Sequence, residues 1–153
     1  MEIERKFLVT LDDIDLAQYD FHRLEQGYLC GNPVVRVRRE DDDFYLTYKG
    51  KGLLCREEYN LPLTKEGYEH LIKKSDNNII TKCRYLIPYD SYTIELDVFE
   101  NELSGLVIAE VEFPSLEEAN SFTAPSWFLK DVTGDARYQN VNLICGLPQT
   151  DDV

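Results

Sequence analysis

The sequence is poor in the residues that build most metal centres and catalytic dyads. Its 153 residues include only two histidines, and its four cysteines stand apart at positions 30, 55, 83 and 145, with no CxxC pair. Scattered cysteines are typical of a reducing compartment and predict neither a zinc site nor a disulfide framework. His22 and His70 match no metal-ligand spacing, so we expect both at the surface. The sequence shows no constellation of Ser, Cys and His for nucleophilic catalysis.

Long apolar runs are also missing. No segment approaches the ~20 apolar residues of a membrane-spanning helix. The first residues, MEIERKF, begin with acidic side chains and lack the basic-then-apolar order of a secretory signal, so we expect a cytoplasmic protein. With 43% hydrophobic and 29% charged residues, the chain is typical of a folded globular protein. We expect one domain over residues 1–148 and a C-terminal tail over residues 149–153.

Positive charge is scarce, because 16 lysines and arginines face 29 acidic residues and the net charge is −13. A protein of that charge repels nucleic acid and anionic membranes, so we expect neither as a partner. The basic residues nonetheless gather on candidate strands, whereas much of the excess acid lies elsewhere, in runs such as 41–43 and 151–152. This distribution predicts a basic interior beneath an acidic surface.

The pattern of apolar and polar residues predicts mainly strands. Eight are expected, over roughly residues 1–9, 23–29, 34–40, 44–49, 54–61, 79–88, 91–99 and 105–113. Short turn signals separate most of them, as in antiparallel hairpins. Eight antiparallel strands can close into a barrel whose interior holds packed side chains or one small ligand. With a few flanking helices this gives an α+β fold.

Three helices are expected from apolar residues at helical spacing. The first covers about residues 64–74. The second opens at Ser115, where Glu118 three residues later completes a capping box. The third covers about residues 135–145 and is followed by Gly146, a common stop signal. If the charged strand faces turn inward, we expect these helices to cover the outward apolar faces.

Charged residues alternate with other residues on most candidate strands. Residues two apart on a strand share one face, so Glu2, Glu4 and Lys6 lie together, opposite Ile3 and Phe7. Five further pairs repeat the arrangement: Arg36 with Arg38, Arg56 with Glu58, Lys82 with Arg84, Glu95 with Asp97, and Glu110 with Glu112. The charged faces either look outward around an apolar core or line the inside of the barrel. Periodicity alone leaves both arrangements open.

Like charges side by side favour the charged interior. Carboxylates as close as Glu110 and Glu112 raise each other's pKa, and a divalent cation removes that repulsion because hard ions prefer carboxylate oxygens. Arg36 beside Arg38 would be neutralised by a polyphosphate, whose oxygens arginine binds in bidentate fashion. A metal ion together with a polyanion would remove both the repulsion between the carboxylates and the repulsion between the arginines. A buried network of protein charges alone has no such justification, since hydrophobic replacement often does as well.

An ordered set of motifs over about residues 1–145 resembles the CYTH, or triphosphate tunnel metalloenzyme, family. The segment EIERK at residues 2–6 is similar to the family's ExExK motif. VRVR at residues 35–38 resembles its RxR strand, and KCRY at residues 82–85 resembles its KxR strand. Further likenesses are LTYKG at 46–50, Arg56 with Glu58, ELDVF at 95–99, AEVEF at 109–113, and VTGD at 132–135 with Arg137, Tyr138 and Asn140.

The resemblance implies an eight-stranded antiparallel tunnel lined by charged side chains, in an enzyme that acts on triphosphates with Mg²⁺ or Mn²⁺. The likeness to the small bacterial inorganic triphosphatases implies hydrolysis of the terminal phosphoryl group of tripolyphosphate. The implied metal ligands are Glu2, Glu4, Glu58, Asp97, Glu110 and Glu112. The implied substrate-binding residues are Lys6, Arg36, Arg38, Lys49, Arg56, Lys82, Arg84 and Arg137. The implied catalytic residues are Glu58, Asp97 and Lys6.

The same likeness leaves other functions open. They are a class IV-type adenylate cyclase that converts ATP to cyclic AMP and pyrophosphate, a thiamine triphosphatase, and a non-catalytic module that binds polyphosphate or nucleotide. Cyclase-type chains usually carry residues before ExExK, whereas Met1 directly precedes Glu2 here. Asn60 stands where an acid often follows the equivalent of Glu58. Arg137 either closes one mouth of the tunnel or anchors its helix. No motif specifies the oligomeric state.

Overall fold

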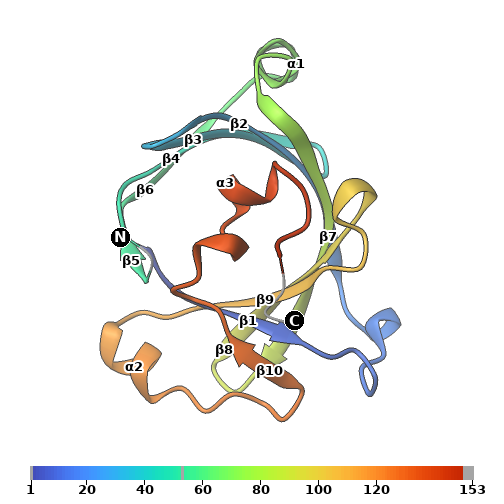
Figure 1. Ribbon diagram of the computed structural model, residues 1–153, viewed down its shortest axis with the longest axis vertical. Coiled ribbons are helices and arrows are strands. Elements are labelled where there is room, and N and C mark those ends of the chain that lie inside the picture. The colour runs from blue at the N-terminus through green and yellow to red at the C-terminus, as the bar shows by residue number, and fades with distance from the viewer. Residues whose placement is uncertain (1, 53, 150–153) are drawn as a thin grey trace.

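The computed structural model describes residues 2–52 and 54–149, whose strands form one antiparallel sheet curled into a nearly closed barrel (Figure 1). In sheet order they are β10 (Phe128–Asp131), β1 (Glu2–Val9), β9 (Val107–Glu112), β8 (Tyr92–Phe99), β7 (Asp76–Tyr89), β2 (Phe21–Gly31), β3 (Val34–Glu40), β4 (Asp43–Lys49) and β6 (Glu58–Pro62). The short strand β5 (Cys55–Arg56) pairs with β1 and brings the two sides of the sheet together. The predicted barrel fold is confirmed.

The strand expected over residues 54–61 is two strands. β5 pairs with β1 whereas β6 pairs with β4, so the chain changes partner at Glu57. The side-chain pattern does not reveal this change, because Arg56 and Glu58 stay on one face and both line the interior. β10 is also absent from the sequence pattern, since it has only four residues and pairs with the far end of β1. The described part of the chain therefore has ten strands, two more than predicted.

Two of the three expected helices begin where the sequence places them. α1 (Lys65–Ile72) is capped by Thr64, whose hydroxyl accepts a backbone hydrogen bond from the first turn. α2 (Leu116–Ser121) is capped in the same way by Ser115. α1 packs on the outside of β2, β3 and β4, whereas α2 and β10 pack against β1 (Figure 1). No helix in residues 2–52 and 54–149 has the length and apolar character needed to cross a membrane.

The third expected helix is wrong in form and in place. Residues 135–145, called here the C-terminal insert, form a 3₁₀ turn, η3 (Ala136–Tyr138), and a short helix, α3 (Asn140–Leu143), separated by extended backbone at Gln139. Figure 1 shows this insert within the ring of strands, where it covers no outer face. Two further 3₁₀ turns, η1 (Leu16–Gln18) and η2 (Asn101–Leu103), lie in connections between strands.

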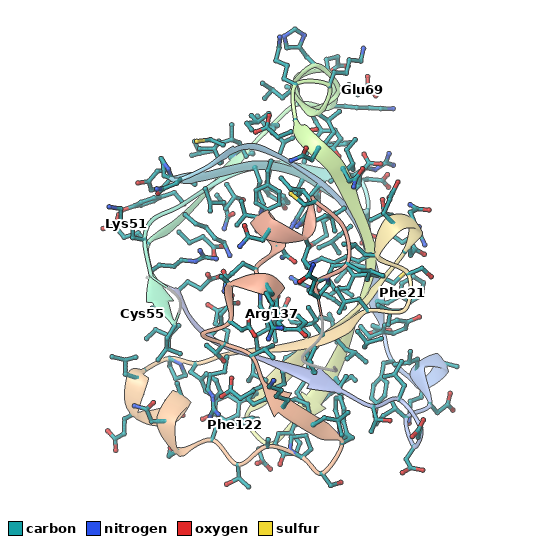
Figure 2. All side chains as sticks on the ribbon, viewed as in Figure 1. Phe21, Lys51, Cys55, Glu69, Phe122 and Arg137 are labelled. Carbon is teal, nitrogen blue, oxygen red and sulfur yellow. The ribbon has the colours of Figure 1, made fainter. Side chains whose placement is uncertain are left out.

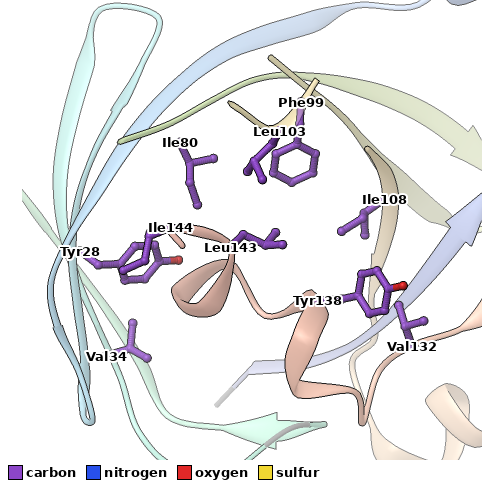
Figure 3. Close-up of a cluster of buried hydrophobic side chains, with 10 residues drawn as sticks. All are labelled: Tyr28, Val34, Ile80, Phe99, Leu103, Ile108, Val132, Tyr138, Leu143 and Ile144. Carbon is purple, nitrogen blue, oxygen red and sulfur yellow. The ribbon is translucent and has the colours of Figure 1, made fainter. Parts of the chain in front are cut away.

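The position of the C-terminal insert follows from an apolar end of the barrel interior. Inward positions that are charged in the middle of the strands become apolar there, and the insert packs against them (Figure 3). This inner cluster consists of Tyr28, Val34, Ile80, Phe99, Leu103, Ile108, Val132, Tyr138, Leu143 and Ile144. A single sequence cannot reveal the match, because it depends on residues far apart in the chain.

A second, outer cluster covers the opposite face of the same strands. Leu96, Val111 and Phe113 are buried there, together with Ala119 of α2. Their outward orientation confirms the prediction that apolar residues between the charged ones face away from the lumen. Phe7 belongs to the same side, since its ring packs 4.6 Å from that of Phe128 of β10. The charged faces are thus free to enclose a polar interior.

Candidate active site in the barrel lumen

The inward faces of the strands surround a cavity of about 210 Å³. Because alternate residues of a strand share a face, the charged positions converge on it. Its charged lining residues are Glu2, Glu4, Lys6, Arg36, Arg38, Glu40, Lys49, Arg56, Glu58, Arg84, Glu95, Glu110 and Glu112. Gln139, Asn140 and Val141 of the C-terminal insert also line it. Of the two arrangements that the sequence left open, the structure has the charged faces turned inward.

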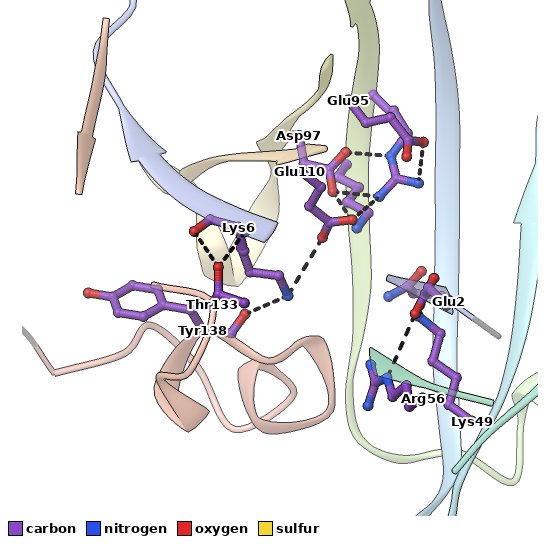
Figure 4. A network of polar contacts seen from close by, with 12 residues as sticks. Glu2, Lys6, Lys49, Arg56, Glu95, Asp97, Glu110, Thr133 and Tyr138 are labelled. Carbon is purple, nitrogen blue, oxygen red and sulfur yellow. Dashed lines mark hydrogen bonds and ion pairs between the residues drawn. The ribbon is translucent and has the colours of Figure 1, made fainter. Parts of the chain in front are cut away.

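Charges on β7, β8 and β9 neutralise one another (Figure 4). Lys82 Nζ lies 2.7 Å from Asp97 Oδ2, and neither side chain is exposed. Arg84 donates from Nε to Asp97 Oδ1 at 2.7 Å and from Nη1 to Glu95 Oε2 at 2.9 Å, and its Nη2 lies 3.4 Å from Glu110 Oε2. Burial alone would raise the pKa of Asp97, but Arg84 and Lys82 hold that pKa below its ordinary value. We call Lys82, Arg84, Glu95, Asp97 and Glu110 the paired wall.

Two carboxylates share one lysine where β1, β4 and β6 meet. Lys49 Nζ lies 3.1 Å from Glu2 Oε1 and 3.4 Å from Glu58 Oε2, and Arg56 Nε lies 3.7 Å from Glu2 Oε1. Burial and the Glu58 carboxylate beside it raise the pKa of Glu2 to about 8. Burial also acts to raise the pKa of Glu58, but Glu2, Lys49 and Asn60 outweigh it and lower that pKa to about 2. Because the two carboxyl groups interact this closely, they titrate as a pair, with one pKa raised and the other lowered.

The remaining charges that face the cavity, five with Glu40 included, have almost no partners among the described residues. Glu4 and Glu112 lie directly opposite each other on β1 and β9, and neither carboxylate has a hydrogen-bond or ion-pair partner among the described residues. Arg36 is only 5% exposed, yet its Nε has no hydrogen-bond partner there. Arg38 donates from Nε to Gln26 Oε1 at 2.8 Å. We call Glu4, Arg36, Arg38 and Glu112 the open set. Two acids and two bases that do not neutralise each other point to a ligand that carries both signs of charge.

The donor atoms suit a hard divalent cation. Seven glutamates line the cavity, and carboxylate oxygens are the ligands that Mg²⁺ and Mn²⁺ prefer. Glu4 and Glu112 are the best placed of them, because they lie opposite each other on β1 and β9 and no lysine or arginine forms an ion pair with either within the described residues. Burial, followed by the charge of Glu110, raises the pKa of Glu4, although the charges of Lys49, Lys6 and Arg84 act in the opposite direction. As they stand, no three Asp, Glu, His or Cys side chains of residues 2–52 and 54–149 are close enough to share one ion.

All but three of the predicted site residues line this one cavity. Lys82 and Asp97 are buried in their ion pair and do not reach it. Arg137 lies on the C-terminal insert (Figure 2), where its Nε donates to Asp135 and its Nη1 donates to the Gln149 carbonyl at 2.8 Å. This geometry favours the interpretation of Arg137 as an anchor of the insert. The chemical roles of all these residues remain predictions.

Five polar lining residues were not among the predicted site residues. Glu95 had a signal, because it shares a strand face with Asp97. Glu40 also had a signal, because it shares a strand face with Arg38, whereas Tyr28 follows the uncharged Gln26 on its strand face. Asn140 stands in the C-terminal segment that resembles the CYTH family, whereas Gln139 had no signal, because its place in the lumen depends on the packing of the C-terminal insert.

A nearly closed antiparallel barrel with a charged cavity inside defines the chain as a tunnel-type barrel protein. The model of the CYTH domain matches residues 1–142, and the chain belongs to the CYTH domain family. Membership of this family implies a divalent metal ion as cofactor, which agrees with the carboxylates of the lumen.

The chain is similar along nearly its whole length to proteins named inorganic triphosphatase. It is 38% identical over 153 residues to that of Nitrosomonas europaea, covering 96% of this chain and 99% of the relative. It is 41% identical over 151 residues to that of Acetivibrio thermocellus, covering 94% and 92%. A crystal structure of an inorganic triphosphatase matches with a TM-score of 0.70 and 34% identity, covering 97% of each chain.

Proposed function

We propose that the protein is a divalent-metal-dependent triphosphatase that removes the terminal phosphoryl group of inorganic tripolyphosphate inside the barrel. The observation that carries the proposal is the open set, in which two arginines and two glutamates face one polar cavity without neutralising each other. Tripolyphosphate is a short, densely anionic chain without an organic group, which suits this lining. The relatives named inorganic triphosphatase support the proposal.

The acidic side of the cavity would hold the metal. Glu4 and Glu112 would bind one or two ions of Mg²⁺ or Mn²⁺ together with Glu2, Glu58 and Glu110. A divalent ion bound there neutralises charge on the phosphate oxygens and polarises the phosphorus–oxygen bonds. The predicted ligand Asp97 is less suited, because Lys82 and Arg84 already neutralise it.

The basic side would hold the phosphate chain. Within residues 2–52 and 54–149, Arg36 and Arg38 have donor groups without partners, so they can bind phosphate oxygens without first breaking an ion pair. Lys6, Lys49, Arg56 and Arg84 surround them and stabilise the charge that develops on the leaving pyrophosphate. Lys82 acts through Asp97 and Arg84, since it does not reach the cavity.

Glu58 is the carboxylate best placed to orient the attacking water. Its low pKa keeps it ionised. Its Oε2 is buried 3.4 Å from the Lys49 ammonium and has no hydrogen-bond partner among the described residues, so it can accept a hydrogen bond from a water molecule. Attack of that water breaks the bond between the terminal phosphorus and its bridging oxygen. Orthophosphate and pyrophosphate leave. Phosphoryl transfer of this kind needs positioning and charge stabilisation and little covalent help from the protein.

One panel of assays tests the proposal. The protein is incubated with tripolyphosphate, ATP or thiamine triphosphate, each with Mg²⁺ or Mn²⁺, and the products are identified by ³¹P NMR. We expect orthophosphate and pyrophosphate from tripolyphosphate, at a higher kcat/KM than from either organic triphosphate. Cyclic AMP from ATP as the main product would replace the proposal with a cyclase. Tight binding of all three without turnover would replace it with a binding module.

Substitutions in the open set test the metal site. We expect Glu4→Gln and Glu112→Gln each to lower kcat/KM about 100-fold or more, since each removes a charged ligand of the ion. The matched control is Glu57→Gln, because Glu57 lies between Arg56 and Glu58 but is exposed on the outer face. Activity at the wild-type level in both lumen variants would reject the proposed metal site.

A further inference from the structure

Lys6 is held at both ends by one short stretch of chain after β10. At its backbone, the Val132 amide donates to the Lys6 carbonyl at 2.8 Å, and the Lys6 amide donates to Thr133 Oγ1 at 2.9 Å. At the far end of its side chain, Lys6 Nζ donates to the Tyr138 carbonyl at 3.1 Å (Figure 4). Residues 132–138 therefore fix both the strand position and the ammonium group of one lumen residue.

The Thr133 hydroxyl takes the place of a missing strand partner. β10 ends at Asp131, which pairs with Phe7 of β1. The amide of the preceding residue, Lys6, would therefore have no carbonyl of β10 to bond. Asp131 Oδ1 accepts from Thr133 Oγ1 at 2.6 Å, which turns a lone pair of the hydroxyl towards the Lys6 amide. Burial would raise the pKa of Asp131, but hydrogen bonds from Thr133 and Arg5 hold it below its ordinary value, so Asp131 stays a pure acceptor.

Two consecutive turns connect this hydroxyl to the carbonyl that holds the ammonium group. The Asp135 amide donates to the Val132 carbonyl at 3.0 Å, and the Tyr138 amide donates to the Asp135 carbonyl at 3.1 Å. The Tyr138 side chain is buried in the inner cluster and is only 5% exposed. The carbonyl of Tyr138 is therefore fixed relative to Thr133 by local hydrogen bonds and by the core.

The ammonium group of Lys6 needs such a restraint. Its side chain is 6% exposed, and Nζ lies 3.6 Å from Glu110 Oε1, at the edge of the paired wall. A lysine has a long, flexible stem and three donors, so without a fixed acceptor it can turn wholly towards the carboxylates. With one donor held by Tyr138, the ammonium stays between the paired wall and the cavity.

We propose that Thr133 is a positioning residue for Lys6. Its hydroxyl fixes residues 132–138 relative to β1, so that the Tyr138 carbonyl holds the Lys6 ammonium where it contacts the phosphate chain. Thr133 is not among the residues that line the cavity. The inference rests on the proposed function, because it assigns Lys6 a contact with the substrate.

A double-mutant cycle tests the inference. We expect Thr133→Val, which keeps the shape and removes the hydroxyl, to lower kcat/KM for tripolyphosphate about tenfold, and Thr133→Ser to restore it. In a Lys6→Met background, Thr133→Val should cause no further loss. Thr10→Val is the matched control, since Thr10 follows β1 and its hydroxyl accepts a local hydrogen bond from the Asp12 amide. An equal loss in both backgrounds would show a merely structural role and overturn the inference.

Two additions keep the test decisive. If Thr133→Val does not fold, Asp131→Asn replaces it in the cycle, because it weakens the orientation of the hydroxyl and leaves the threonine in place. If the wild-type protein hydrolyses no triphosphate, the proposed function fails by itself. The inference is then tested by calorimetric binding of metal-free tripolyphosphate, where the cycle should again be non-additive, and equal affinities of wild type and Thr133→Val would contradict it.

Discussion

Arg84 and Arg36 are buried in the same lumen, at inward positions of the same sheet, yet they have opposite surroundings. Arg84 interacts with Glu95, Asp97 and Glu110, whereas the Nε of Arg36 has no partner within the described residues. Burying a charge is costly unless it is paired and hydrogen-bonded. The paired wall is therefore a self-sufficient framework. In the open set Arg36 is buried, and we expect its unpaired charge to lower the stability of the free protein; a ligand that binds only the folded state would offset that loss.

The largest effect should follow from breaking the paired wall. We expect Arg84→Met to lower the free energy of unfolding by about 3–5 kcal/mol, because it leaves buried carboxylates without their main cation. Urea denaturation of the metal-free protein measures it. The burial of Asp97, which is 0% exposed, makes relief by water difficult. A change below about 1 kcal/mol would show that the paired wall is not a framework.

Arg36→Met is the matched substitution in the open set. We expect the free energy of unfolding to stay unchanged or to rise by about 1 kcal/mol, because an uncompensated buried charge is removed. The affinity for tripolyphosphate should fall about 10- to 100-fold, since a charge-assisted hydrogen bond contributes about 1.5–3 kcal/mol. Denaturation and calorimetry on the same sample separate the two effects. Destabilisation as large as that of Arg84→Met would erase the distinction between the two sets.

A smaller effect is expected from pH. The pKa of Glu2 is raised to about 8 in the folded protein. The contribution of Glu2 to stability is therefore fully present at pH values below the ordinary pKa of a glutamate, and it is lost as the pH rises through about 8. The same proton must leave before Glu2 can bind a metal, so the affinity for Mn²⁺ should rise between pH 7 and pH 9. Glu2→Gln should remove most of this pH dependence. An affinity that is flat over this range in the wild-type protein would exclude Glu2 as a ligand.

The sequence predicts the charged faces well, because period-two alternation is a local property of each strand. The faces of Glu2, Glu4 and Lys6, and of Arg36 and Arg38, all reach the predicted cavity. It does not predict which charges are paired. Arg84 and Arg36 both stand in a like-charged pair on a strand, and only the register of β7 against β8 places Asp97 opposite Arg84.

The errors of prediction share a physical cause. The break at Glu57, strand β10 and the inward position of the C-terminal insert all depend on partners that are distant in the chain. The helical pattern over residues 135–145 correctly marks an apolar face, but Leu143 and Ile144 find their partners inside the barrel. Local patterns give the face of an element, and tertiary packing decides what covers it.

The most direct test of the central claim is a crystal structure with Mn²⁺ and a non-hydrolysable tripolyphosphate analogue, with the metal located by its anomalous signal. The account predicts manganese at the carboxylates of Glu4 and Glu112 and phosphate oxygens on Arg36 and Arg38, all inside the barrel. Manganese and analogue bound on the outer surface, with the open set still unpartnered, would contradict it.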